Sequence, residues 1–369
     1  MRTVWIFGAV TAVGVGGLLG GCSAAQSTPS VASTGVTGAA VATVPTGVTV
    51  PAGFTATTLV SGHGATTGPD DITQLGDRIY VGYQNGVGSK GEPAPGGGRT
   101  STVVAYTTGG TETGRWTLTG KVDGMTADPT THTVLATVNE DANSSLYSID
   151  PATGQGKVTH YQFSPNPLPH GGGTDSISVR NGQVFVVASA PAAKAGTKTY
   201  TAPALYTVTL AGTTASTTPA LQDNARATDA VTGKSVTLNL SDPDSSESVP
   251  ASDPRFGGDL LLDGQGDQQL VFVSQPGAKP KATVLNIKTQ VDDSAFATGP
   301  GQTLYVVDSA KNSVIAIRGD FKAGDAFASI PKDSTKQPAT LGRVNLSTGQ
   351  ITAFATGLGS PKGLLFASN

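Results

Sequence analysis

The feature that most constrains the fold is a degenerate repeat of paired strands. In each copy an Asp precedes a short apolar strand, a polar turn and a second strand rich in Val, Phe or Tyr. One such strand pair cannot bury both of its faces, so the copies must pack against one another. The repeat therefore predicts an all-β ring of similar sheets. We call the Asp and the short strand after it the head of a copy. The copies are Pro69–Tyr83, Val122–Asn139, Thr174–Ala188, Gly258–Val273 and Val291–Ile317. S-P-K-G-L-L-F-A near the C-terminus is a further head, with Lys362 in place of Asp.

The clearest copy is Val291–Ile317, which contains three strand patterns. Ser294–Thr298 is small and half-apolar, Thr303–Val307 is β-branched and aromatic, and Ser313–Ile317 alternates apolar and polar residues. Gly299-Pro300-Gly301 between the first two supplies the dihedral angles of a tight turn. We expect these three strands to form the inner part of one blade of a β-propeller.

The length of the chain sets the number of blades. A four-stranded blade takes roughly 40–50 residues, so residues 52–369 would make six blades, with seven as the alternative. The heads favour six. The strand pattern Phe54–Val60 lies before the first head and should complete the blade opened by the C-terminal strand. This pairing would close the ring and remove the exposed sheet edges.

The N-terminal segment has the pattern of an exported lipoprotein. Arg2 is followed by the apolar run Val4–Leu19 and then by Leu19-Gly20-Gly21-Cys22, which fits a lipobox. We therefore expect residues 1–21 to be a signal peptide and Cys22 to carry the lipid. The run is short for the alternative, a transmembrane anchor. Residues 22–51 are rich in Ser, Thr, Ala, Val and Gly, which predicts a disordered tether on the extracytoplasmic face of the cell membrane.

Charge and cysteine content exclude several kinds of partner. The chain has a formal net charge of −3, no cluster of Lys and Arg, and Trp116 as the single tryptophan after the signal peptide, so nucleic-acid binding is not expected. Cys22 is the single cysteine, which excludes an internal disulfide. The expected partners are the membrane, through the lipid alone, and an unknown protein or small-molecule ligand.

The Asp heads should meet at one mouth of the central channel, because every innermost strand begins at the same face of a propeller. Residues after the second strands, such as Asn139 and Glu140, should rim the same face. Carboxylate and amide oxygens suit a hard cation, calcium before magnesium. We predict a metal site made by Asp123, Asp175, Asp293 and Asn139. The alternative is that each Asp caps its own turn or bonds the backbone of the next blade. The heads are Asp70 or Asp71, Asp123, Asp175, Asp259, and Asp292 or Asp293.

Two other polar segments contain residues that could form a site. Asp242, Asp244 and Glu247 have a D-x-D-x-x-E spacing within the long segment Asp223–Gly257, but they lack the twelve-residue pattern of an EF-hand. We expect a solvated loop there. His170 opens an H-G-G-G segment, yet the chain has no G-x-S-x-G motif, so a serine-hydrolase triad is excluded. For His170 we expect an exposed loop position, and the alternative is that it faces the channel mouth, because it stands just before Asp175.

Two segments resemble known propeller families. T-L-Y-V-V-D-S-A-K-N-S-V-I-A-I, residues 303–317, resembles the blade signature of NHL and YVTN-type propellers, and V-D-G-M-T-A-D, residues 122–128, resembles the D-G-M segment of the senescence-marker-protein/gluconolactonase family. The second resemblance implies a six-bladed propeller with a divalent metal in the channel mouth and calcium-dependent lactonase activity. It also implies that Asp123 is a metal ligand and the catalytic base. The family's metal-binding Asn is matched by Asp175, and its first-blade Glu by Asp70 or Asp71.

Two functions remain open from the sequence. The first is a membrane-anchored binding or scaffold propeller with a cation at the channel mouth. The second is a calcium-dependent lactonase or esterase, in which Asp123 would be catalytic. No cofactor other than calcium is expected.

The lipobox yields the first testable prediction. Replacing Cys22 by Ala removes the thiol that would receive the lipid, so the Cys22→Ala precursor should stay uncleaved at this site and should not incorporate labelled palmitate. Metabolic labelling of the full-length chain checks this. Lipid labelling of the variant equal to that of the wild type would contradict it.

Overall fold

Strands provide nearly all of the regular structure in the computed structural model, which describes residues 43–64, 66–153, 156–277, 279–332 and 338–368. The helical element in these residues is the 3-10 turn η1 (Pro151–Thr153). No helix in the described residues is both long enough and apolar enough to span a bilayer. Residues 39–369 form one unit, and the predicted signal peptide, Cys22 and most of the predicted tether lie outside the described residues.

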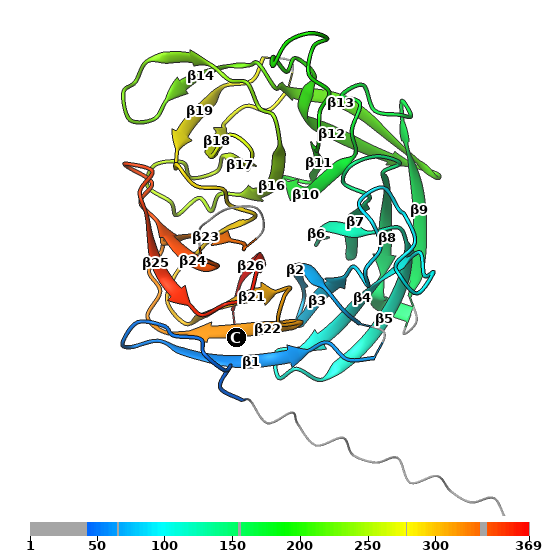
Figure 1. The fold of residues 1–369 in the computed structure, drawn as a ribbon, viewed down its shortest axis with the longest axis vertical. Coiled ribbons are helices and arrows are strands. Elements are labelled where there is room, and N and C mark those ends of the chain that lie inside the picture. The colour runs from blue at the N-terminus through cyan, green and yellow to red at the C-terminus, as the bar shows by residue number, and fades with distance from the viewer. Residues whose placement is uncertain (1–42, 65, 154–155, 278, 333–337, 369) are drawn as a thin grey trace, which may run out of the picture. The chain divides into compact units, whose positions relative to one another are not determined.

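Most strands of this unit fall into antiparallel groups of four, the blades of a propeller, and the outer strands of the second and third blades pair in parallel, which joins these two blades into one eight-stranded sheet (Figure 1). The first blade comprises β2 (Pro69–Leu75), β3 (Arg78–Tyr83), β4 (Thr100–Thr107) and β5 (Glu112–Thr119). The second comprises β6 (Val122–Asp128), β7 (Thr133–Val138), β8 (Ser145–Asp150) and β9 (Lys157–Ser164). The third comprises β10 (Thr174–Arg180), β11 (Gln183–Ala188), β12 (Pro203–Ala211) and β13 (Thr214–Gln222).

The remaining blades are less regular. The fourth comprises β16 (Pro243–Ser248), β17 (Leu260–Gly264), β18 (Gln269–Val273) and β19 (Ala282–Asn286), and it is extended by β14 (Arg226–Asp229) and β15 (Ser235–Thr237). The fifth comprises β20 (Ser294–Phe296), β23 (Ala326–Ile330), β24 (Thr340–Val344) and β25 (Ile351–Thr356). The sixth comprises β26 (Pro361–Ser368), β21 (Gln302–Asp308), β22 (Ser313–Arg318) and β1 (Thr55–Ser61).

The innermost strands contact one another in a closed cycle, β2 to β6, β10, β16, β20, β26 and back to β2. The N-terminal strand β1 pairs with β22, and the C-terminal strand β26 pairs with β21 in the same sheet. The predicted all-β propeller, closed by its N- and C-terminal strands, is therefore confirmed. Because the two ends of the described chain share one blade, the sheet edges there are covered by strand pairing.

The prediction for Val291–Ile317 was wrong in one respect. The three strands form, but β20 pairs with β23, whereas β21 and β22 belong to the next blade and pair with β26 and β1. The chain thus crosses to the sixth blade and returns to the fifth before it ends in β26 (Figure 1). A strand pattern indicates which face of a strand is buried, but it does not name the partner strand.

The fourth head was also misplaced. The sequence put it at Gly258–Val273, but these residues form the second and third strands, β17 and β18. The innermost strand is β16, with the sequence P-D-S-S-E-S, inside the segment that we expected to be a solvated loop. The pattern was missed because β16 has no Val, Ile or aromatic residue, since it lines the polar channel and packs little apolar surface.

Residues 43–51, which the sequence placed in the tether, contact the ring. Thr49 pairs with Thr356, and its amide donates to the Thr356 carbonyl at 3.0 Å. Lys311 Nζ donates to the Thr46 carbonyl at 3.0 Å. Val48 and Val50 are half-buried against the apolar cluster between the fifth and sixth blades. The ordered domain therefore begins before the predicted boundary at residue 52.

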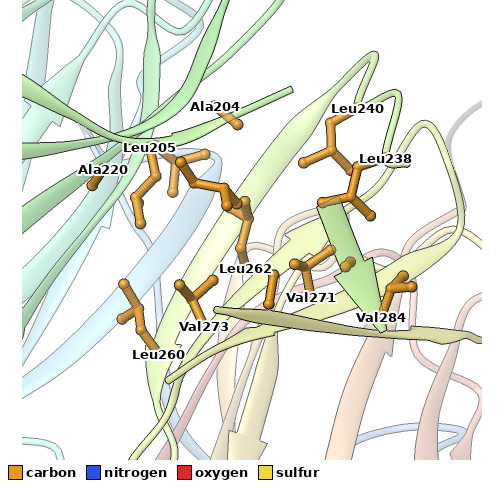
Figure 2. Close-up of a cluster of buried hydrophobic side chains, with 14 of the residues drawn as sticks. Ala204, Leu205, Ala220, Leu238, Leu240, Leu260, Leu262, Val271, Val273 and Val284 are labelled. Atoms are coloured by element: carbon orange, nitrogen blue, oxygen red, sulfur yellow. The ribbon is translucent and has the colours of Figure 1, made fainter. Parts of the chain in front are cut away.

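The apolar core is divided into layers between neighbouring blades. Leu260 and Leu262 of β17 join Leu205 in the layer between the third and fourth blades (Figure 2). Leu261, which lies between them in the sequence, joins the layer on the other face, against the fifth blade. Successive side chains of a strand point to opposite faces, so one Leu-rich strand contributes to two layers. Every blade is thus held by its two neighbours.

An aromatic cluster stabilises the junction of the fifth and sixth blades. Phe321 is fully buried, and its ring packs against Phe54, Phe327, Phe354 and Phe366 at centroid distances of 4.9 to 6.1 Å. These four rings come from the segment before β1 and from β23, β25 and β26. The cluster therefore links both ends of the ordered chain to the fifth blade.

Removing the central ring of this cluster should weaken the closure. Phe321→Ala leaves a cavity among the aromatic rings, so we expect the free energy of unfolding to fall by about 3–5 kcal/mol. Urea denaturation followed by circular dichroism measures the change. Val231→Ala, at a side chain that is 58% exposed, is the matched control and should be near neutral. A loss at Phe321 no larger than at Val231 would contradict the structural role of the cluster.

Candidate functional site

One end of the central channel is a cavity of about 170 Å³ whose lining residues are mostly acidic, and we call it the acidic mouth. The innermost strands contribute half of these acids, and the other half lie in loops. Lys362 of β26 also lines the cavity. The acidic residues are Asp70, Asp71, Asp123, Glu140, Asp141, Asp175, Asp242, Asp244, Asp292 and Asp293.

A local irregularity recurs where the acids enter the mouth. The antiparallel register of β2, β6, β10 and β16 with the second strand of each blade shifts at the Asp head. The shifts fall between Pro69 and Ile72, Val122 and Met125, Thr174 and Ile177, and Pro243 and Ser246. A bulge leaves residues outside the ladder and re-aims their side chains. The bulge therefore explains why these Asp side chains depart from the alternation of the strand and face the channel.

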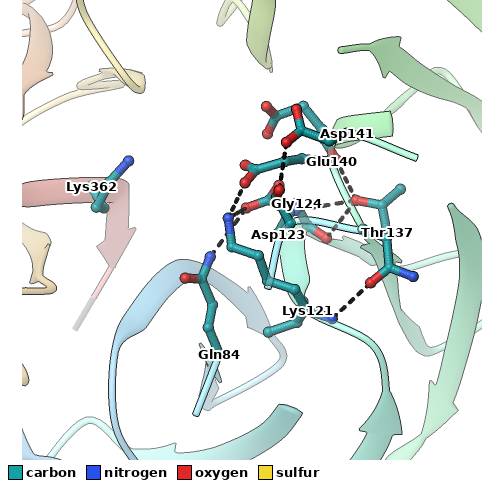
Figure 3. Close-up of polar contacts among 12 residues, drawn as sticks. Gln84, Lys121, Asp123, Gly124, Thr137, Glu140, Asp141 and Lys362 are labelled. Carbon is teal, nitrogen blue, oxygen red and sulfur yellow. Dashed lines mark hydrogen bonds and ion pairs between the residues drawn. The ribbon is translucent and has the colours of Figure 1, made fainter. Parts of the chain in front are cut away.

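Three of these acids form a tight group, the carboxylate triad Asp123, Glu140 and Asp175. One carboxylate oxygen of each lies within 4.8 Å of the others. Asp123 belongs to β6 and Asp175 to β10, whereas Glu140 lies in the loop after β7. Asp123 is 4% exposed, and its Oδ2 has no hydrogen-bond partner among the described residues. Its Oδ1 accepts a hydrogen bond from Gln84 Nε2 at 3.2 Å (Figure 3).

Two lysines bring positive charge to the mouth. Lys121 Nζ contacts Glu140 Oε1 and lies 3.7 Å from Asp123 Oδ1 (Figure 3). On another side of the cavity, Lys362 Nζ contacts Asp292 Oδ1. Burial alone would lower the pKa of either lysine, but the surrounding carboxylates outweigh it and raise both pKa values. Both ammonium groups therefore stay charged at neutral pH.

The carboxyl groups outnumber the lysines, and their pKa values reflect this excess. Burial, followed by the charge of neighbouring acids, raises the pKa of Asp292 to about 6 and that of Asp293 to about 7. Burial also raises the pKa of Asp123 and Asp175 well above the usual range. Glu140 behaves differently, because its contact with Lys121 outweighs burial and lowers its pKa. The mouth thus holds more negative charge than its own cations neutralise.

Some mouth acids are engaged in holding the ring together. Asp71 Oδ2 of the first blade accepts the amide of Met125 in the second blade at 2.5 Å. Asp293 Oδ2 accepts the Leu364 amide of β26 at 2.7 Å, and its Oδ1 accepts the Ser245 hydroxyl of β16 at 2.5 Å. These bonds are of the type expected from the alternative interpretation, in which an Asp head bonds the backbone of the next blade. Asp71 and Asp293 are therefore structural acceptors as well as mouth residues.

Of the four metal ligands predicted from the sequence, two lie together and two are already engaged in hydrogen bonds. Asp123 and Asp175 come together in the triad, and Asp293 lines the same cavity with both oxygens already bonded. The side chain of Asn139 shapes its loop instead. Its Oδ1 accepts the Lys121 amide at 2.9 Å, its Nδ2 donates to the Asn143 carbonyl at 3.0 Å, and its φ is 69°. Asn139 thereby holds the loop that places Glu140.

The prediction missed three mouth residues that matter. Glu140 was expected at the rim but not in the ligand set, and Asp244 was assigned to a solvated loop. Lys121 was not considered, although it lies two residues before Asp123, immediately ahead of β6. Asp259, predicted as a head, precedes β17 and is not among the residues that line the mouth. The D-P-D spacing before β16 was the available signal for Asp244.

His170 does not occupy an exposed loop position, so that prediction was wrong. The side chain is buried, with 1% exposed, and its Nδ1 lies 3.3 Å from the Tyr206 hydroxyl. Burial lowers its pKa. His170 packs within the third blade and does not line the acidic mouth.

The mouth continues into a second cavity of about 370 Å³ in the channel. The two cavities share Asp71, Ser176, Ser245 and Asp293 as lining residues. Below this ring of residues the lining turns to hydroxyl and apolar side chains, with Glu247 as the further acid. The acidic character is therefore concentrated at one end of the channel.

Comparison with known proteins yields similarity of fold alone. No protein-family model matches the sequence, and no curated protein matches it. A periplasmic gluconolactonase from Pseudomonas aeruginosa superposes with a TM-score of 0.43 at 11% identity, over 81% of this chain and 88% of that one. A Lactobacillus plantarum protein gives 0.44 at 12% identity, over 82% and 89%. A Desulfotomaculum acetoxidans protein of unknown function gives 0.43 at 8% identity, over 87% and 98%.

The charge excess predicts a pH-dependent stability. Burial, then the charges of Glu140, Asp267 and Asp141, raises the pKa of Asp242 from 3.8 to about 6. An acid whose pKa is raised by folding favours the folded state below its unfolded pKa, and this contribution is lost as the pH rises through the folded pKa. Asp242 should therefore cost stability above about pH 6 and none below about pH 4.

Asp242→Asn removes the charge and keeps the shape. We expect the variant to unfold with about 1–2 kcal/mol more free energy than the wild type near pH 8, and to match it near pH 4. Urea titrations in metal-free buffer at the two pH values measure the difference. A gain of equal size at both pH values would show that charge repulsion is not its cause.

Proposed function

We propose that this protein is a binding propeller that holds a hard divalent cation, calcium before magnesium, at the carboxylate triad of the acidic mouth. The observation that carries the proposal is Asp123 Oδ2, a buried carboxylate oxygen without a hydrogen-bond partner in the described residues. It lines the cavity beside Glu140 and Asp175. A buried polar oxygen without a partner is costly, and a cation between the three carboxyl groups would satisfy it.

Electrostatic repulsion supports the same conclusion. Two ionised carboxylates about 5 Å apart repel by roughly 3 kcal/mol at an effective dielectric constant near 20. After burial, repulsion of this kind is a cause of the raised pKa values of Asp123 and Asp175. Lys121 contacts Asp123 and Glu140, whereas it acts on Asp175 only through its charge. A divalent cation supplies the missing charge.

The donor set favours calcium over transition metals. The candidate ligands are all carboxylate oxygens, and neither His nor Cys lines the cavity among the described residues. Hard cations prefer such oxygens, whereas zinc and copper favour imidazole and thiolate. Calcium takes six to eight oxygen ligands, so three carboxylates leave positions for water or for an oxygen of a bound partner. The site would thus bind a partner through the open coordination positions of the cation.

The location of this activity follows from the sequence alone. The signal-peptide pattern and the lipobox at Cys22 support export and anchoring by lipid on the extracytoplasmic face of the cell membrane. An exported domain meets calcium concentrations at which weak sites are filled. We therefore include lipid anchoring at the cell surface in the proposal.

The alternative function is a calcium-dependent lactonase. It is favoured by the place of the triad inside a cavity of about 170 Å³, which is of the size of a small sugar lactone. A cation held there would polarise a lactone carbonyl. Asp123, whose pKa burial raises, would then accept a proton from water. Calcium-dependent hydrolysis of gluconolactone by the wild type, lost in Asp123→Asn, would support this function.

Calcium should stabilise the folded protein by mass action. At a hundredfold excess over the dissociation constant the gain is about 2.7 kcal/mol, which gives a rise of several degrees in Tm. Asp123→Asn should lose most of this rise, because Asn lacks the charge that the cation requires. Differential scanning calorimetry with and without calcium measures both proteins.

Asp320→Asn is the matched control, because Asp320 is 72% exposed and is paired with Lys322 away from the mouth. It should keep the full calcium response. If the wild type shows neither a thermal shift nor binding heat with calcium, the mouth acids are structural, and the proposed function and the lactonase alternative both fail.

A further inference from the structure

The Lys121 ammonium group occupies the same part of the mouth as the proposed cation. Its Nζ contacts Glu140 Oε1 and lies 3.7 Å from Asp123 Oδ1, and carboxylate oxygens of these two acids lie within 4.8 Å of each other in the triad. In Figure 3 the side chain extends from below and ends beside Asp123 and Glu140. Lys121 thus already neutralises two of the three candidate ligands.

A cation and this ammonium cannot share the space. Calcium binds carboxylate oxygens at 2.3–2.6 Å, so an ion on Asp123 Oδ1 and Glu140 Oε1 would lie against Lys121 Nζ, and an ion on the other oxygens of these acids would still be repelled by its charge. The Lys121 side chain is 14% exposed, so little solvent is available to screen that repulsion. Full coordination by both acids would therefore require the ammonium to withdraw.

The backbone around Lys121 is fixed, so the side chain is the part that can move. The Lys121 amide donates to Asn139 Oδ1 at 2.9 Å, and the Asn139 amide donates to the Lys121 carbonyl at 2.8 Å. These two bonds tie Lys121 to the loop that carries Glu140. The side chain above them is a flexible stem with rotatable bonds, which can swing toward other acids of the mouth.

We propose that Lys121 is an internal competitor of the cation, which sets the affinity of the triad for divalent ions by occupying it in the metal-free protein. This inference rests on the proposed function, since it concerns the same site. It is carried by the contacts of Nζ with one oxygen each of Asp123 and Glu140, together with the buried Asp123 Oδ2, which Lys121 leaves without a partner.

Lys362 offers a matched comparison inside the same cavity. Its Nζ contacts Asp292, and the structure gives it no contact with a triad acid. Figure 3 shows it on a separate strand, apart from the triad. Removing the charge of Lys362 alters the electrostatic potential of the mouth. Removing the charge of Lys121 alters this potential too, and it also removes the ammonium group that contacts the triad. The difference in calcium affinity between the two variants therefore separates direct competition from long-range electrostatics.

The test is isothermal titration of calcium into the wild type, Lys121→Met, Lys121→Gln and Lys362→Met. Methionine keeps the unbranched apolar stem, and glutamine is a second neutral variant in case Met disturbs folding. We expect both Lys121 variants to bind calcium about tenfold or more tightly than the wild type, and Lys362→Met to change the Kd by about threefold or less. Thermal denaturation without calcium checks that each variant is folded.

The outcomes separate this inference from the proposed function. If the wild type binds calcium and the Lys121 variants bind no more tightly than Lys362→Met, competition is overturned and the proposed function stands. If the wild type binds no calcium and the Lys121 variants do, competition is supported and the proposed function is overturned for the natural protein. If none of the proteins binds calcium, both are overturned.

Discussion

The repulsion among carboxylates at the channel axis is the constraint on which the rest of this structure depends. A closed ring brings the heads of all innermost strands to one place, and in this chain nearly every head carries Asp. The apolar layers between blades must therefore hold the ring closed against a concentration of like charge. Those layers are continuous around the ring, because alternating residues of one strand, such as Leu261 and Leu262, pack on opposite sides.

Several interactions within the ring reduce this repulsion. Asp71 and Asp293 accept backbone amides of neighbouring blades, so their charge strengthens the junctions that it would otherwise weaken. Lys362 neutralises Asp292, and Lys121 neutralises parts of the triad. Raised pKa values allow others to stay protonated. Asp123 Oδ2 has no hydrogen-bond partner among the described residues after all of these interactions. An added cation would therefore stabilise the ring most at this oxygen.

The same arrangement links stability to binding. Asp293 bonds β16 and β26, and β26 is the strand that closes the ring at the C-terminal end. The mouth and the closure thus share residues, so a change of charge at the mouth acts on the closure as well. A protein built in this way holds its site rigidly, since the elements that carry the acids are also the elements that hold the ring.

The sequence by itself determined the all-β class, the ring, its closure by terminal strands and the gathering of Asp123, Asp175 and Asp293 at one mouth. These follow from local patterns, because strand period and repeated heads are properties of neighbouring residues. Only the tertiary structure decided which strands pair, as in the separation of β20 from β21, and it replaced Asp259 by Asp244. It also decided which of the predicted ligands are engaged elsewhere: Asn139 and Asp293 form hydrogen bonds, whereas Asp123 meets Glu140 and Lys121. The reason is physical, since the partners of Asp293 come from other blades, far away in the sequence, and the bonds of Asn139 to the backbone of Lys121 and Asn143 form only when the second blade folds.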